Sequence, residues 1–503
     1  MRLGSAAAVT FCVVAVPVWG QENPLPDLFS DVIDVRVVNV EVVVTDKKGN
    51  RIRGLQASDF ELQVDGEPVG IEYFTEIDDG RALAASDDSV GNVPSLAPDE
   101  PVATNYLVFI DDLSAIRQHR NRVLARLESD LTLLGPADRV AIVAYDGRDV
   151  TRVADWTNSP EEIQKALEHT RERKALGLMR LAGLGDKTHR AVMAAAASLR
   201  SFADAPGRKV MLLLIGRWPT QVDLWSPYSA WASPFAHLRL NDVYGPLVHA
   251  ANLVGYSLYP VDLPGLQGGS FRSRSRERRW HDVLQHLADE TGGLPMINSF
   301  SRKALAETAA DTRSYYWLGF EPPRNEDDEL HDIRIRVAGH RGLRVRSREN
   351  YLDMSRGAEV TMLVEGTLLF GGSPGAESLE VNFGEPRKAG FRKISWPMEV
   401  TIPLDDLTLL PVGDRWMTEL EFRIALIDPF GDRSDTPISR VPITGEEAPS
   451  PGDAFVYETD LVMRKRKHRY VAAVYDPLSG EILSAGGDVD PKPGTSTREA
   501  EPD

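Results

Sequence analysis

The strongest constraint on the fold of this chain is a set of short, almost uninterrupted apolar runs that alternate with helical patterns. The runs occupy residues 106–110, 140–145, 209–215 and 256–262. Runs of this kind are typical of parallel strands that are covered on both faces. Helical signals lie between them, such as the capping pair Ser159-Pro160. The alternation predicts βαβ units, and therefore a doubly wound parallel α/β domain over residues 105–353.

Both flanks of this region show the period-two alternation of half-buried strands. Residues 29–77 contain β-branched alternation and a tight Asp65-Gly66 turn, which predicts a small all-β module. Residues 78–104 are polar and rich in proline, as expected of a linker. The alternation returns over residues 357–487, which we interpret as a β-sandwich domain, and residues 488–503 form a charged tail that we expect to be disordered.

The N-terminus has the pattern of a secretory signal peptide. Arg2 precedes an apolar run over residues 6–18, and a small residue, Gly20, ends the segment. The run is too short to span a membrane, and no later segment is long and apolar enough to do so. We therefore predict cleavage after Gly20 and an exported protein, periplasmic or secreted, without a transmembrane segment. A buried N-terminal helix is the alternative.

Charge and motif content narrow the classes of function. Of the 503 residues, 57 are Lys or Arg and 75 are Asp or Glu, which gives a net charge of −18. This balance argues against a general nucleic-acid binder, which needs a basic face. The only cysteine, Cys12, lies in the predicted signal peptide, and no His-Glu-x-x-His motif occurs. We therefore predict that the protein is not an enzyme.

Three separated sequence blocks carry a family resemblance. They span residues 35–74, residues 206–293 and residues 315–348, and include the stretches Val44-Thr45-Asp46-Lys47-Lys48-Gly49, Tyr259-Pro260-Val261-Asp262 and Tyr315-Tyr316-Trp317-Leu318-Gly319-Phe320. Together they resemble the secreted VWFA-related proteins of the acidobacterial type, over residues 29–353. The resemblance implies a von Willebrand factor type A domain, whose usual role is metal-dependent binding of protein ligands. It implies no catalytic activity.

The resemblance also implies where a Mg²⁺ ion would bind, and there the pattern is damaged. If Asp111 is the first ligand, Leu113 and Ala115 replace both hydroxyl positions. If Asp112 is the first ligand, Ser114 is retained and Ile116 replaces the other hydroxyl; in both cases Thr188 matches the threonine of the second loop. The usual later aspartate is missing, and Arg217 follows the strand instead. We therefore expect a degenerate site without a bound cofactor, although an intact metal site stays open. In the alternative, the two aspartates cap a loop or pair with Arg217.

The segment after residue 215 is unusually aromatic. Trp218, Trp225 and Trp231 follow Arg217 within a region rich in proline and serine. Exposed tryptophan is common at binding hot spots, so these four residues form the candidate ligand-binding surface. They could equally pack the segment onto the domain.

These observations lead to one functional prediction and two alternatives. The predicted function is an exported, non-enzymatic module that binds a protein of the envelope or the exterior through the type A-like domain. The first alternative is a structural or scaffold protein of the envelope that acts through its β modules. The second is a secreted hydrolase whose site is not recognised.

Overall fold

A computed structural model describes residues 37–491, except residues 84–95, 178–183, 204, 217, 219–239, 265–270, 298–302, 323–326, 341, 371–372, 391–392, 430–433 and 435. The chain divides into two compact units. One comprises residues 34–355, and the other contains residues 356–503 together with residues 1–33. The predicted signal peptide, residues 1–20, lies outside the described residues. No helix in the described part of the chain is both long and apolar enough to cross a membrane.

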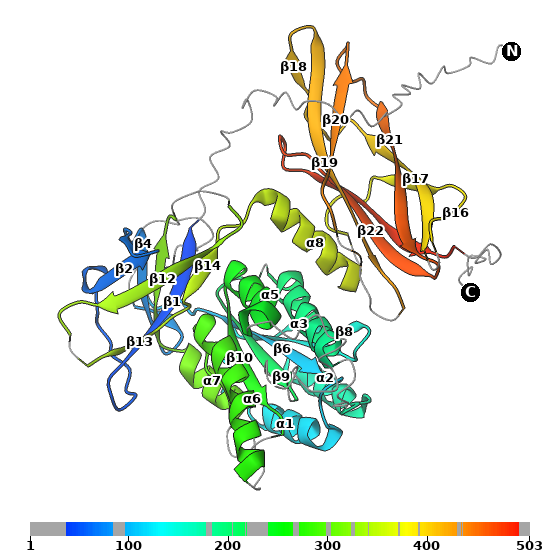
Figure 1. Cartoon of the computed structure of the whole chain (residues 1–503). Helices are drawn as coiled ribbons and strands as arrows, with labels where there is room; N and C mark the ends of the chain where they lie inside the picture. The colour runs from blue at the N-terminus through cyan, green and yellow to red at the C-terminus, as the bar shows by residue number, and fades with distance from the viewer. Residues whose placement is uncertain are drawn as a thin grey trace, which may run out of the picture. The chain divides into compact units, whose positions relative to one another are not determined.

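The apolar runs form one five-stranded sheet in the unit of residues 34–355 (Figure 1). Its order is β10-β9-β6-β7-β8, and the strands are β6 (Thr104–Asp111), β7 (Arg139–Tyr145), β8 (Val150–Thr157), β9 (Arg208–Ile215) and β10 (Tyr256–Asp262). Strands β6, β7, β9 and β10 are parallel, whereas β8 runs antiparallel to β7. Only four residues separate β7 from β8, which is too short for the crossover that a parallel neighbour needs.

Among the described residues, six helices accompany this sheet. They are α1 (Arg117–Ser129), α2 (Pro160–Glu172), α3 (Leu184–Ser201), α5 (Leu240–Leu253), α6 (Phe271–Glu290) and α7 (Ala304–Thr312). Helices α1, α2 and α7 pack on the sheet face that carries Tyr106, Val108 and Ile110, and they share one apolar core with it. The predicted cap of α2 is confirmed, because Ser159 Oγ accepts a hydrogen bond from the Glu162 backbone N–H.

Two further sheets combine strands from both ends of this unit. One has the order β13-β1-β11-β4-β5 and the other β14-β12-β2-β3, and all their pairings are antiparallel. The strands are β1 (Val38–Thr45), β2 (Phe60–Val64), β3 (Glu67–Pro68), β4 (Tyr73–Asp78), β5 (Arg81–Ala82), β11 (Tyr315–Phe320), β12 (Leu330–Val337), β13 (Arg344–Arg346) and β14 (Asn350–Leu352). A shared core joins the two sheets, with Val40 opposite Leu318 and Leu62 opposite Ile335.

The predicted fold class is wrong. The expectation was a doubly wound parallel α/β domain flanked by an N-terminal β module and a C-terminal β-sandwich. Instead, most of the described strands lie in antiparallel sheets, and the one sheet with parallel strands is mixed. The N-terminal strands do not close on themselves, because β1 and β2 pair with β11 and β12. Local alternation shows that a strand is half-buried, but it does not identify the strand's partner.

Part of the predicted linker, residues 78–104, is described. It packs against the sheet of order β13-β1-β11-β4-β5. The backbone of Ala82 exchanges hydrogen bonds with residues Asp99 and Glu100, and Leu96 is buried beside Ala82 and Ile77. Residues 84–95 of the linker lie outside the described residues.

The second unit begins with a helix where the sequence predicted strands. Helix α8 (Arg356–Phe370) buries Val360, Val364 and Leu368, whose i, i+4, i+8 spacing is helical rather than period two. Two antiparallel sheets follow, with β17 (Lys393–Pro403) central in one and β19 (Arg415–Ile427) central in the other. Strands β15 (Glu380–Phe383), β16 (Arg387–Lys388) and β21 (Ala454–Arg464) pair with β17.

The second of these sheets holds β18 (Leu410–Val412), β20 (Ser439–Gly445), β22 (His468–Tyr475) and β23 (Ile482–Val489) around β19. Residues of both sheets, among them Val400, Ile402, Leu420 and Val474, form one apolar core. This arrangement is a two-sheet sandwich. Residues 492–503 of the tail lie outside the described residues.

Candidate functional site

The carboxylate that ends β6 is enclosed by donors from its own chain. Asp111 is fully buried, and its Oδ2 accepts hydrogen bonds from Ser114 Oγ at 2.5 Å and from Trp218 Nε1 at 2.9 Å. Its Oδ1 accepts the Leu113 backbone N–H at 3.1 Å. Burial raises the pKa of Asp111, and these donors oppose that effect. The oxygen atoms that a Mg²⁺ ion would use therefore already have protein partners.

The second carboxylate, Asp112, is held by two arginines. Arg120 Nη1 lies 2.5 Å from Oδ1, and Arg173 Nε lies 3.1 Å from Oδ2. Asp112 and Arg120 are both fully buried. The sequence suggested Arg217 as the partner, but that residue lies outside the described part of the chain. Arg120 is placed by the first turn of α1, which brings it back toward the end of β6.

Three of the remaining predicted site residues, Ser114, Thr188 and Trp218, are described, and each makes contacts within the protein. Ser114 Oγ accepts the Gly216 backbone N–H at 3.0 Å, so this serine joins two loops. Thr188 is buried within α3. Trp218 is only 2% exposed and stacks on Tyr244 with the ring centroids 5.7 Å apart. Trp225 and Trp231 lie outside the described residues.

A cleft of about 1270 Å³ opens elsewhere in the same unit, and residues of α5, α6, α7, β1, β12 and β13 line it. At its base, Asp311 binds Arg51 Nη2 and Arg346 Nη2, each at 2.6 Å, and accepts the Tyr259 hydroxyl at 2.7 Å. Burial alone would raise the pKa of Asp311, but Arg346, Arg51 and Arg208 together lower it to about 2. The base of the cleft is therefore a fixed ionic network.

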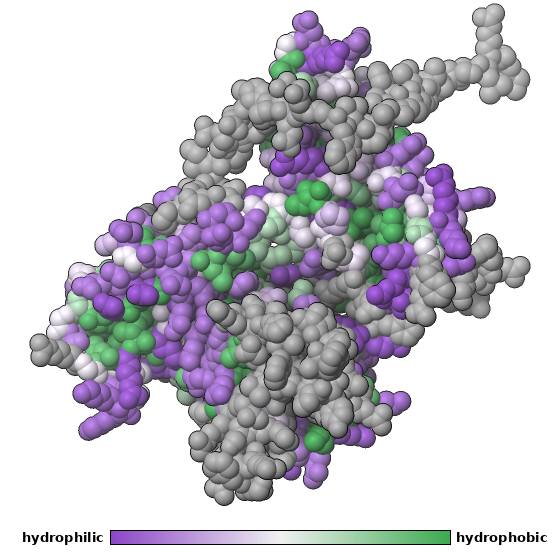
Figure 2. Space-filling model, in the orientation of Figure 1, coloured by the Kyte–Doolittle hydropathy of each residue, from purple (hydrophilic) through white to green (hydrophobic). Residues whose placement is uncertain are grey.

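The lining of the cleft carries both positive and negative groups. Arg334 and Arg336 project from β12 and Arg344 from β13; all three side chains are exposed, and none of these side chains makes a hydrogen bond or an ion pair with another described residue. Acidic residues line the cleft as well, among them Asp332 on β12, Glu290 and Glu349. Burial is the main cause that raises the pKa of Glu290 and of Glu349, and the charge of Asp332 adds to it. Hydrophilic residues predominate over the region of β12 and α7 on the face seen in Figure 2.

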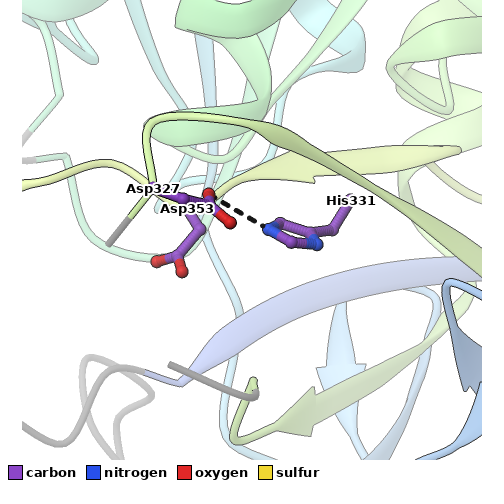
Figure 3. Close-up of side chains that lie close together, drawn as sticks. All are labelled: Asp327, His331 and Asp353. Carbon is purple, nitrogen blue, oxygen red and sulfur yellow. Dashed lines mark hydrogen bonds and ion pairs between the residues drawn. The ribbon is translucent and has the colours of Figure 1, made fainter. Parts of the chain in front are cut away.

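A compact group of metal-ligand types lies near one end of β12. Ligand atoms of Asp327, His331 and Asp353 all lie within 4.8 Å of one another (Figure 3). His331 Nε2 is 3.4 Å from Asp327 Oδ1, and His331 Nδ1 is 2.7 Å from Asp65 Oδ2. No sequence motif predicted this group, because its members come from separate segments; the Asp-x-x-x-His spacing of residues 327–331 is the one local signal of it in the sequence.

One serine in a Gly-x-Ser-x-Gly sequence bears on the hydrolase alternative. Ser373 lies between Gly371 and Gly375, and its Oγ donates to the Gly375 carbonyl at 2.6 Å and contacts Ser484 Oγ. A catalytic elbow would hold this hydroxyl against a histidine at a strand-to-helix turn. Here the segment follows α8, and these contacts join it to β23. Gly375 allows that approach, since a Cβ would lie 2.0 Å from the Ile482 carbonyl oxygen.

Comparison with known proteins leaves the chain without an assigned family. No protein-family model matches it, and no curated protein does. Among solved structures, it is similar to the PilB minor pilin from Streptococcus sanguinis (9% identity, TM-score 0.25, 56% of this chain and 87% of the pilin). It is also similar to the pilus adhesin SpaC from Lactobacillus rhamnosus GG (8%, 0.27, 80% and 54%) and to a Bacteroides uniformis beta-glucuronidase (9%, 0.16, 35% and 19%). Likenesses at these TM-scores carry no argument about fold or function.

Proposed function

We propose that this chain is an exported, non-enzymatic binding protein and that the cleft of residues 34–355 holds an extended, acidic segment of a protein partner. The observation that carries the proposal is the arginine row formed by Arg334, Arg336 and Arg344. A guanidinium group binds a carboxylate through two parallel hydrogen bonds. These three groups have no partner among the described residues, so they are available to a ligand.

The remaining charges of the cleft would orient such a ligand. Arg51 and Arg346 share the single carboxylate of Asp311, so this part of the cleft keeps a net positive charge that adds to the attraction. Glu290, Glu349 and Asp332 also line the cleft and repel carboxylates. An acidic segment would therefore place its carboxylates along the arginine row and a neutral or basic part toward the glutamates. Repulsion of this kind contributes to specificity as much as attraction does.

One contact in the cleft favours binding over catalysis. Within the cleft, Ser347 Oγ donates to the Arg348 carbonyl and not to His249 or His286, so it is not paired with a base. The sequence also predicts export through residues 1–20. Membership of the VWFA-related secreted proteins stays a prediction that the sequence blocks alone support.

The test uses a short fluorescent peptide of alternating Glu and Gly, and fluorescence anisotropy on the full chain without its signal peptide. We expect saturable binding that weakens with added salt. The double variant R334E/R336E should bind at least about tenfold more weakly, because two attractive contacts become repulsive.

R387E is the matched control. Arg387 is equally exposed and lies on β16 of the other unit. A peptide of alternating Ser and Gly controls for backbone binding. Equal affinity of wild type and R334E/R336E for the acidic peptide, or no difference between the two peptides, would contradict the proposal.

A further inference from the structure

We propose that Asp327, His331 and Asp353 form a binding site for a divalent transition metal of the Zn²⁺ type, with Asp65 orienting the histidine. This site is separate from the arginine row, and its residues differ from those at the end of β6. Neither the resemblance nor the predicted function requires it.

The three side chains offer a suitable set of ligand atoms. Two carboxylates and one imidazole present atoms that all lie within 4.8 Å of one another, so a single ion between them could contact all three after small rotations (Figure 3). Three protein ligands with a remaining position for water is a common arrangement around Zn²⁺. The site is partly shielded, since the side chain of His331 is 12% exposed and that of Asp327 is 30% exposed.

The hydrogen bonding of His331 matches that of a metal-bound histidine. Its Nδ1 lies 2.7 Å from Asp65 Oδ2, while Nε2 faces Asp327. Metal-ligating histidines usually donate their second ring N–H to a carboxylate, which fixes the tautomer and makes the ligating nitrogen more basic. Asp65 is itself fixed, because its Oδ1 accepts the Asp332 backbone N–H at 2.9 Å. Both ring nitrogens face carboxylates, so the metal-free imidazole can donate to both. A bound metal ion would replace the proton on Nε2, while Nδ1–H still donates to Asp65.

A buried hydroxyl beside the group independently indicates a missing partner. Tyr351 is 3% exposed, and its hydroxyl has no hydrogen-bond partner in the described part of the chain. Tyr351 lies opposite His331 in the β12–β14 pairing, and the two rings stack with centroids 5.1 Å apart. A water on the bound ion would supply the partner that this phenol lacks.

The ligand types decide between metals. Mg²⁺ and Ca²⁺ prefer sets made of oxygen atoms alone, whereas imidazole suits Zn²⁺ and related transition metals. One histidine and two carboxylates therefore favour Zn²⁺ over Mg²⁺. A divalent ion and the two carboxylates together have a net charge of about zero. The bound ion would therefore offset the repulsion between the two aspartates.

The experiment titrates ZnCl₂ into the full chain without its signal peptide, by calorimetry and in competition with a chromogenic zinc indicator. We expect one equivalent of Zn²⁺ to bind, and Mg²⁺ not to compete. H331A should weaken binding by at least about a hundredfold, and D65N by about ten- to a hundredfold, as is usual for partners of a ligating histidine. Co²⁺ in place of Zn²⁺ should give visible absorption bands that are lost in H331A.

His340 supplies the matched control, because it is exposed, lies in the turn after β12 and is not part of the group. H340A should bind Zn²⁺ like the wild type. Thermal melts in EDTA establish that each variant is folded, and D65N keeps the test decisive if H331A unfolds. Absence of stoichiometric Zn²⁺ binding, or equal affinity in wild type, H331A and D65N, would overturn the proposal. Neither outcome of the zinc titration bears on the peptide-binding proposal, because the binding of the acidic peptide is measured without metal.

Discussion

At the scale of single residues, Asp311 should make the free energy of unfolding depend on pH in the acidic range. Its pKa is about 2 in the folded protein, against an ordinary value of 3.8, because three arginines outweigh its burial. A carboxyl whose folded pKa is lowered contributes stability that is complete above its unfolded pKa and is lost as the pH falls through the folded pKa. The shift of roughly two units corresponds to about 2 kcal/mol.

We therefore predict that wild type exceeds D311N in free energy of unfolding at pH 6, and that the difference shrinks by about 2 kcal/mol between pH 5 and pH 2. Urea unfolding at a series of pH values measures it. A difference that stays constant across this range would contradict the prediction.

Asp112 should be the more costly residue to change. It and Arg120 are fully buried as an ion pair, and removal of one member leaves the other charge without compensation. We expect D112N to lower the free energy of unfolding by about 3 to 5 kcal/mol.

The double variant D112L/R120M should recover part of that loss, because it removes both charges and keeps apolar volume. The exposed pair of Arg152 and Asp155 is the control, and D155N should change stability little. If D112N and D155N lowered the free energy of unfolding by similar amounts, burial of the Asp112–Arg120 pair would not explain the loss, and the prediction would be contradicted.

The residues at the end of β6 could be predicted from the sequence, but the residues that contact them could not. Asp111, Asp112 and Ser114 follow a predicted strand, and the structure does bring them together. Their donors were not predictable in the same way, because Arg173 and Trp218 come from loops whose paths depend on the whole fold. Asp65 and His331 are further apart still, at 266 positions from each other in the chain. No local pattern reports such a contact.

At the scale of elements, local patterns located strands but did not pair them. The apolar runs lie in β6, β7, β9 and β10, where burial on both faces makes the pattern continuous. Strand β8 was missed, since it is half-buried at the sheet edge and its side chains do not alternate cleanly. Helix α8 was missed because apolar residues cover much of its surface, which hides a 3.6-residue period.

The pairing of β1 with β11 and of β2 with β12 yields a prediction about fragments. A fragment of residues 34–312 lacks β11, β12, β13 and β14, so β1 and β2 would expose apolar faces. We expect the fragment of residues 34–355 to unfold in a single sharp thermal transition. The shorter fragment should aggregate or melt broadly.

Circular dichroism and dye binding on both fragments test this prediction. Addition of a peptide covering residues 315–355 should partly restore the sharp transition of the shorter fragment. A shorter fragment as stable as the longer one would contradict the observed pairing.

At the scale of the whole molecule, the two units have separate apolar cores. One core lies between the sheets of the sandwich, and others lie within residues 34–355. A domain with its own core can fold alone. We therefore predict that residues 356–491 fold in isolation.

Calorimetry checks this prediction. The full chain should give two transitions, and each should match that of the corresponding fragment within a few degrees. One transition for the full chain, with neither fragment folded, would mean that the units depend on each other.

The pairing of β1 with β11 also has a consequence for biosynthesis. A ribosome adds about 5 to 20 residues per second, and β11 begins about 270 residues after β1 ends. The first strand would therefore wait about 15 to 50 seconds for its neighbour, although β6 and β7 can pair much sooner. During this interval β1 presents unpaired backbone groups and a row of valines to the surroundings. The nascent chain consequently needs either a holding chaperone or delayed folding until synthesis has passed residue 320.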